Sequence, residues 1–137
     1  MQVDHTHRRL GRTDRVGFVV GLGGITLMPM EQDAAVRLGH EAIDIGATHF
    51  DVAPTYGDAQ AKMGLVLRDR RDEVFLSCKT IARDAATARA ELNESLRLLQ
   101  TDRIDLYQFH ALDTDEDLDA VTAPGGALEV FLDARRA

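Results

Sequence analysis

A chain of 137 residues is long enough for one domain with a hydrophobic core. Its 16 basic and 23 acidic side chains give a net charge of -7 without a basic cluster, so nucleic acid is not an expected partner. The single cysteine, Cys78, excludes an internal disulfide and fits a reducing compartment. The polar N-terminus has no signal-peptide core, and no apolar run reaches the roughly 20 residues that a membrane-spanning helix needs. We therefore expect a soluble, cytoplasmic protein with no membrane partner.

Short β-rich runs alternate with helical patterns along the chain, which is typical of βαβ units and a parallel sheet. Within residues 1–16, the turn formers Gly11 and Asp14 indicate a small N-terminal hairpin. The strands predicted after it are residues 17–23, 48–53, 74–79 and 104–110.

The helices are expected between and after these strands. The first runs from Asp33, as N-cap, to Ile45, with Gly46 ending it. Asp58 is expected to cap a short second helix, and Asp84 opens a third with leucines at i, i+4 and i+7. Residues 113–119 read as an acidic connector, and a last helical pattern follows the Pro-Gly-Gly at 124–126.

Four βα units make up half of an eightfold barrel. The pattern therefore predicts an α/β fold of parallel βα units, half of a TIM (βα)8 barrel, which needs about 250 residues when complete. We interpret the chain as a truncated barrel occupying residues 1–137 as one partial domain. A compact four-stranded α/β sheet is the alternative.

Three polar side chains fall at or near the C-terminal ends of consecutive predicted strands: Asp51, Lys79 and His110. In barrels and open parallel sheets these ends build the active site. Tyr56 follows Asp51 by five residues, so its hydroxyl can fold back toward the same place. A phenol has an ordinary pKa near 10, and a nearby ammonium stabilises its phenolate form. Such a group of side chains suits carbonyl reduction, in which carbon receives a hydride and oxygen a proton.

Four segments in order resemble the aldo-keto reductase family across nearly the whole chain, from about residue 10 to the last helix. They are Gly21-Leu-Gly-Gly, Phe50-Asp-Val-Ala-Pro-Thr-Tyr-Gly, Leu76-Ser-Cys-Lys and Ser95-Leu-Arg-Leu-Leu-Gln-Thr-Asp-Arg-Ile-Asp-Leu-Tyr-Gln-Phe-His. By this resemblance Tyr56 is the proton donor, Lys79 assists it, Asp51 supports Lys79, and His110 orients the carbonyl of an aldehyde or ketone substrate.

The resemblance also implies a cofactor, NADP(H) and in some members NAD(H). The residues that match the nicotinamide end of the family's site are Gly23, Gly24, Ile25 and Asp51. Most of the family's cofactor contacts come from the second half of the barrel, so we expect weak or absent cofactor binding by this chain. A second hypothesis is a non-catalytic half-barrel that associates as a homo-oligomer through open sheet edges or serves as an interaction module.

Other chemistries fit the sequence less well. The glycines at 21 and 23 would need a third at Thr26 for a dinucleotide-binding loop, and a barrel strand end is favoured. The aspartates from 113 to 119 imitate a calcium loop, but Leu118 stands where glycine is needed. His5 and His7 lack a third ligand and are expected in a frayed tail, so no metal site is predicted.

Two reactive side chains also have competing interpretations. Cys78 alternates with Lys79 along the strand and is expected to be a core residue beneath the helices. A lyase that uses Lys79 as a Schiff-base amine would need a neutral lysine, which the neighbouring Asp51 disfavours.

Overall fold

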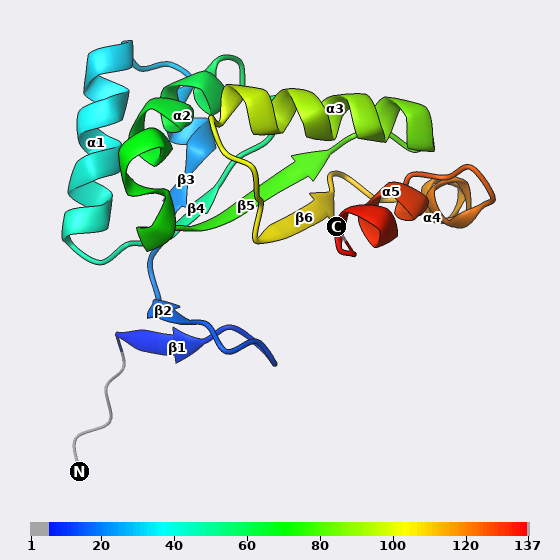
Figure 1. Cartoon of the computed structure of the whole chain (residues 1–137), viewed down its shortest axis with the longest axis horizontal. Coiled ribbons are helices and arrows are strands. Elements are labelled where there is room, and N and C mark those ends of the chain that lie inside the picture. Colours follow the sequence, from blue (N-terminus) through cyan, green and yellow to red (C-terminus); the bar gives the residue numbers. More distant parts are fainter. Residues whose placement is uncertain (1–5, 137) are drawn as a thin grey trace.

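The computed structural model describes residues 6–136, and four parallel strands form its main sheet. These are β3 (Leu22–Gly23), β4 (His49–Asp51), β5 (Phe75–Thr80) and β6 (Leu106–Phe109), which lie side by side in chain order (Figure 1). Each neighbouring pair is parallel. The prediction of parallel βα units is confirmed.

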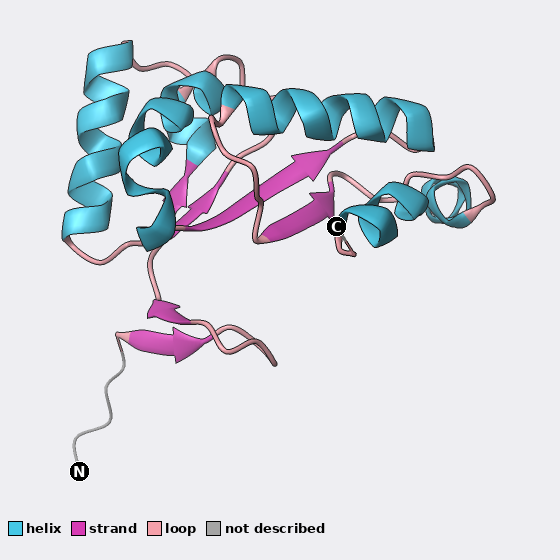
Figure 2. Cartoon of the chain, in the orientation of Figure 1, coloured by secondary structure: helices cyan, strands magenta, loops and turns pink. Residues whose placement is uncertain are grey.

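Helices follow each strand of the sheet and pack on one face of it (Figure 2). The elements are the short 3-10 helix η1 (Gly24–Leu27), α1 (Gln32–Asp44), α2 (Ala59–Arg70), η2 (Arg71–Glu73), α3 (Ala85–Leu98), α4 (Asp115–Thr122) and α5 (Leu128–Ala134). None of the helices in residues 6–136 has the length and hydropathy to cross a membrane.

Alternation along the strands separates a core face from a polar face. Phe50 pairs in register with Leu76, and both are fully buried under α1 and α2. Asp51 pairs with Ser77, and successive strand residues point to opposite faces. Asp51 and Lys79 therefore lie on the face away from the helices. The same alternation buries Cys78, as the sequence predicted.

The prediction of a buried strand over residues 17–23 is wrong for most of that run. Val16–Phe18 forms β2, which pairs antiparallel with β1 (His7–Arg9) in an N-terminal hairpin. Val19 and Val20 are 54% and 55% exposed, and only Leu22–Gly23 joins the main sheet. An apolar run has no marker for its pairing partner, so a hairpin strand and a sheet strand in tandem look like one element.

The prediction of an acidic connector over residues 113–119 is also wrong, because residues 115–122 form α4. The Thr114 hydroxyl caps its N-terminus by accepting a hydrogen bond from the Asp117 amide. Acidic residues at positions 115–117 stand in the first turn, where the helix dipole favours negative charge. At α1 the N-cap is Glu31, two residues before the expected Asp33.

The C-terminal helices attach to β6 through aromatic rings. Phe131 of α5 stacks on Phe109 with a centroid distance of 4.2 Å and also contacts Tyr107 at 4.9 Å. Val121 of α4 and Val130 of α5 are buried in the same apolar cluster. This packing supports the last strand, and with it the backbone that leads to His110.

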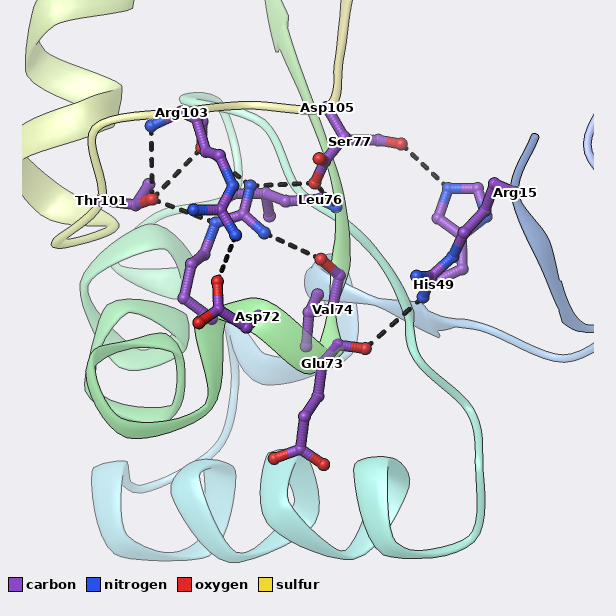
Figure 3. A network of polar contacts seen from close by, with 11 residues as sticks. Arg15, His49, Asp72, Glu73, Val74, Leu76, Ser77, Thr101, Arg103 and Asp105 are labelled. Atoms are coloured by element: carbon purple, nitrogen blue, oxygen red, sulfur yellow. Dashed lines mark hydrogen bonds and ion pairs between the residues drawn. The ribbon is translucent and has the colours of Figure 1, made fainter. Parts of the chain in front are cut away.

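A polar network fixes the N-terminal ends of β5 and β6 (Figure 3). Asp105 accepts hydrogen bonds from the Leu76 amide at 2.7 Å and from the Arg71 guanidinium at 2.8 Å. Arg71 also donates to the carbonyls of Val74 and Arg103, at 2.8 and 2.9 Å. Because one guanidinium joins both strands, the network holds them in register and so places their C-terminal ends.

Candidate active site

The candidate site lies at the C-terminal rim of the sheet. Asp51 is the last residue of β4, Lys79 is next to last in β5, and His110 directly follows β6. Tyr56 lies in the turn between β4 and α2. The structure brings all four side chains together, although they are spread over 60 positions of the chain.

The Lys79 ammonium is the centre of this group. Its nitrogen lies 2.5 Å from each carboxylate oxygen of Asp51 and 3.5 Å from the carbonyl of Val52. The side chains are 14% and 39% exposed, so this ion pair is only partly shielded from water.

Tyr56 lies near the same ammonium. The Lys79 nitrogen lies 5.6 Å from the centroid of the Tyr56 ring. The ring meets the imidazole of His110 edge to face, with centroids 5.8 Å apart and planes at 89°. The Tyr56 amide bonds to the Ala53 carbonyl at 3.1 Å, so the turn after Pro54 folds the phenol back over the strand ends. The phenol, imidazole and ammonium therefore form one cluster.

His110 is held through its backbone. Its amide donates to the Thr80 carbonyl at 2.9 Å, and its carbonyl accepts from Arg83 at 3.1 Å. Arg83 also bonds the carbonyl of Ala111, which has a φ of +50°, at 2.7 Å. The imidazole Nδ1 is buried and has no hydrogen-bond partner within residues 6–136.

Sequence reasoning missed Arg83. Its guanidinium pairs with Asp117 of α4 at 2.7 Å, and this hydrogen bond lowers the pKa of the Asp117 carboxyl. Arg83 thus ties the segment after β5 to the segment after β6. The residues it joins are 27 to 34 positions away, and no local pattern marks such a contact.

The residues expected at the nicotinamide end lie beside Asp51. Gly23 is in register with Asp51, and the space where its Cβ would stand is open to at least 4 Å. Ile25 is 53% exposed. Gly24 is different, because its Cβ would come within 2.9 Å of the Asp51 carbonyl oxygen and of Val52. Its lack of a side chain serves the packing of η1 on β4.

The remaining candidates have structural surroundings. Gln60 donates hydrogen bonds to the Cys78 sulfur and to Ser95, and burial raises the pKa of the thiol. His7 lies in β1 against Phe18, so the frayed-tail prediction is wrong for it, while His5 falls outside the described residues. Within residues 6–136, no three side chains of His, Cys, Asp or Glu gather as metal ligands.

Sequence comparison places these features in a known family. The sequence model of the aldo/keto reductase family matches residues 19–133. "Protein REDOX 2" of Catharanthus roseus is 36% identical over 106 residues, which are 67% of this chain and 32% of that protein. "Aldo-keto reductase YhdN" of Bacillus subtilis is 35% identical over 103 residues, 65% of this chain and 31% of that protein.

Solved structures agree with the sequence relatives. A putative aldo-keto reductase from Pseudomonas aeruginosa superposes with a TM-score of 0.83 at 28% identity, over 96% of this chain and 56% of the other. An aldo-keto reductase from Klebsiella pneumoniae in complex with NADPH superposes with a TM-score of 0.63 at 31% identity, over 80% of this chain and 43% of the other. The chain spans about a third of the two curated relatives and about half of these solved chains. Its four parallel strands are part of their barrel, and the chain belongs to the aldo/keto reductase family.

Proposed function

We propose that the rim around Lys79 reduces the carbonyl group of small aldehydes or ketones to an alcohol, with NADP(H) as cofactor and Tyr56 as proton donor. One observation carries the proposal. The Lys79 ammonium contacts both oxygens of Asp51 and lies 5.6 Å from the centre of the Tyr56 ring, which itself packs on His110. A proton donor, a cation beside it and an imidazole thus surround one position on the rim.

The proposed roles follow from this arrangement. Tyr56 passes its hydroxyl proton to the substrate oxygen as the carbonyl becomes an alcohol, and the adjacent Lys79 ammonium stabilises the phenolate that remains. Asp51 holds the ammonium in place. His110 donates a hydrogen bond to the substrate oxygen and so orients the carbonyl. The nicotinamide, when bound, supplies the hydride that the carbonyl carbon receives.

The nicotinamide end of the cofactor fits the chain. Open space at Gly23, the exposed Ile25 and the neighbouring Asp51 would hold the ring beside the phenol. The relative from Klebsiella pneumoniae in complex with NADPH supports a nicotinamide cofactor for the same strands. NADP(H) is favoured over NAD(H) by that resemblance alone, and the cytoplasmic location stays a prediction.

The Schiff-base lyase is disfavoured by the same geometry. An amine that attacks a carbonyl must be free to approach it, whereas the Lys79 nitrogen lies 2.5 Å from both oxygens of Asp51. The half-barrel homo-oligomer without catalytic activity has no specific contact in its favour and stays a prediction that sedimentation velocity can test.

The test is NADPH oxidation by the whole chain with an aromatic aldehyde, followed by absorbance. We expect slow turnover that falls by about 10² to 10⁴-fold in Tyr56→Phe, the usual contribution of a general acid. The matched control is Tyr107→Phe, whose hydroxyl lies buried on the helix side of β6. Fluorescence titration with NADPH measures binding separately. Weak or absent binding is expected, because the chain carries only the nicotinamide end of the family's cofactor site, and tight binding would contradict that expectation. Equal activity in Tyr56→Phe would refute the role of Tyr56.

A further inference from the structure

The chain has only two lysines, Lys62 and Lys79, beside fourteen arginines. Lys79 belongs to the rim already described. Lys62 lies in the first turn of α2, and its side chain is 6% exposed, less than that of Lys79 at 14%. A buried ammonium requires partners, because the loss of hydration is costly. The partners of Lys62 therefore indicate what it holds together.

The Lys62 ammonium binds the end of the segment that follows β3. It donates to the carbonyls of Met30 at 2.6 Å, Leu27 at 3.0 Å and Met28 at 3.3 Å. These carbonyls belong to the end of η1 and the turn after it, and the Leu27 carbonyl also accepts from the Met30 amide at 3.1 Å. Segment 24–30 also contains Ile25, which faces solvent beside the rim. One cation thus gathers the C-terminal oxygens of this segment.

The fourth partner of Lys62 comes from the turn that bears Tyr56. Asp58 lies 2.7 Å from the ammonium. It stands at the N-cap position of α2 but makes no capping hydrogen bond, so its carboxylate serves the lysine. A second contact joins the same two segments, since Gly57 has a φ of +55° and its Cβ would come within 3.0 Å of the Met28 side chain.

We propose that Lys62 is a positioning residue that locks segment 24–30 to the Tyr56 turn. The effect of this contact on catalysis rests on the proposed reductase site. In that site Ile25 lies on the nicotinamide side and Tyr56 on the proton-donating side. The ammonium makes these two sides of the rim one rigid unit. Three protons on Lys62 serve four oxygens from the two segments, which leaves no donor free for another task.

Hydrogen exchange of the whole chain tests the lock without catalysis. Lys62→Met keeps the length of the side chain and removes the charge, and Lys62→Arg restores a cation. We expect the amides of segment 24–30 to exchange at least about tenfold faster in Lys62→Met, because buried carbonyls lose a charged donor. Amides of β5 and β6 should keep their wild-type rates, and Lys62→Arg should recover part of the protection.

The matched control is Arg68→Met, which removes an exposed cation paired with Asp69 on the same helix. It should leave exchange in segment 24–30 unchanged. Wild-type rates in that segment for Lys62→Met would overturn the proposal. Uniform acceleration over the whole sheet would overturn it too, because the lysine would then contribute only global stability.

Titration with NADPH separates this inference from the proposed function. Where the wild-type chain binds NADPH, Lys62→Met should raise the Kd for NADPH about tenfold, while Arg68→Met should leave it unchanged. An equal Kd in all three proteins would show that Lys62 does not affect cofactor binding. Where the wild-type chain binds no NADPH, the exchange rates alone decide whether Lys62 holds the two segments together.

Discussion

At Gly64 the backbone of α2 lies close to the end of α3, and Gly64→Ala tests that contact. A Cβ at this position would lie 2.2 Å from the carbonyl oxygen of Leu98 and 3.1 Å from the backbone of Leu99. The first distance is about 1 Å short of an ordinary contact, and backbone atoms cannot rotate away as a side chain can. Leu99 is fully buried, so the two helices would have to separate at a packed interface.

Two opposing terms set the size of the effect. Alanine in place of glycine inside a helix favours the folded state by about 1 kcal/mol. Overpacking of a core costs about 1 to 3 kcal/mol, and a clash with backbone belongs at the upper end of that range. We therefore expect a net loss of about 2 kcal/mol in the free energy of unfolding. For a domain of this size the loss corresponds to a fall in Tm of roughly 5 to 8 °C.

Thermal unfolding followed by circular dichroism measures this change. Ala61→Gly, in the same helix, is the control for helix propensity, and it should lower stability by about 1 kcal/mol or less. If Gly64→Ala were as stable as the wild type or more so, the gain in propensity would outweigh the clash. That result would refute the close contact between Gly64 of α2 and the end of α3.

Three further predictions concern other polar groups. Burial lowers the pKa of His49 below its ordinary 6.5, so the folded state favours the neutral ring and loses stability as pH falls from 6.5 through the folded pKa. Between about pH 7 and 5, the Tm of His49→Gln should therefore fall less than the Tm of the wild type. Parallel curves of Tm against pH for the two proteins would contradict this. The Cys78 thiol is buried, and burial also raises its pKa. A thiol reagent should therefore react only as fast as the native chain opens. Rapid stoichiometric labelling would instead show that the thiol is accessible. Asp105→Asn removes the carboxylate that accepts hydrogen bonds from Arg71 and from the Leu76 amide. It should lower the free energy of unfolding by about 1.5 to 3 kcal/mol, measured by urea unfolding. An unchanged urea midpoint would show that the network does not stabilise the fold.

The positions of the candidate active-site residues could be predicted because their signals are local. Asp51, Lys79 and His110 each stand where an apolar β-rich run ends, and parallel strands bring such ends to one edge. The structure places these side chains and Tyr56 together, as that reasoning expected. Their catalytic roles remain proposals that the kinetic tests address.

The boundaries of the helices and strands were less predictable, because they depend on partners elsewhere in the chain. Residues 17–23 form one apolar run, yet the run divides between the hairpin and the main sheet. The division depends on β1, which supplies the partner for Val16–Phe18. The acidic residues at 113–119 suggest a solvated loop by composition, but the cap at Thr114 and the buried Val121 make them a helix.

The amino-acid sequence by itself determined the order of the strands, the alternation that buries Phe50 and Cys78, and the chemical types at the strand ends. These properties depend on residues that are neighbours in the chain. Only the tertiary structure decided what Lys62 and Arg83 do, because their partners come mostly from other segments, about 30 positions away, and a long flexible side chain gives no periodic signal of its direction.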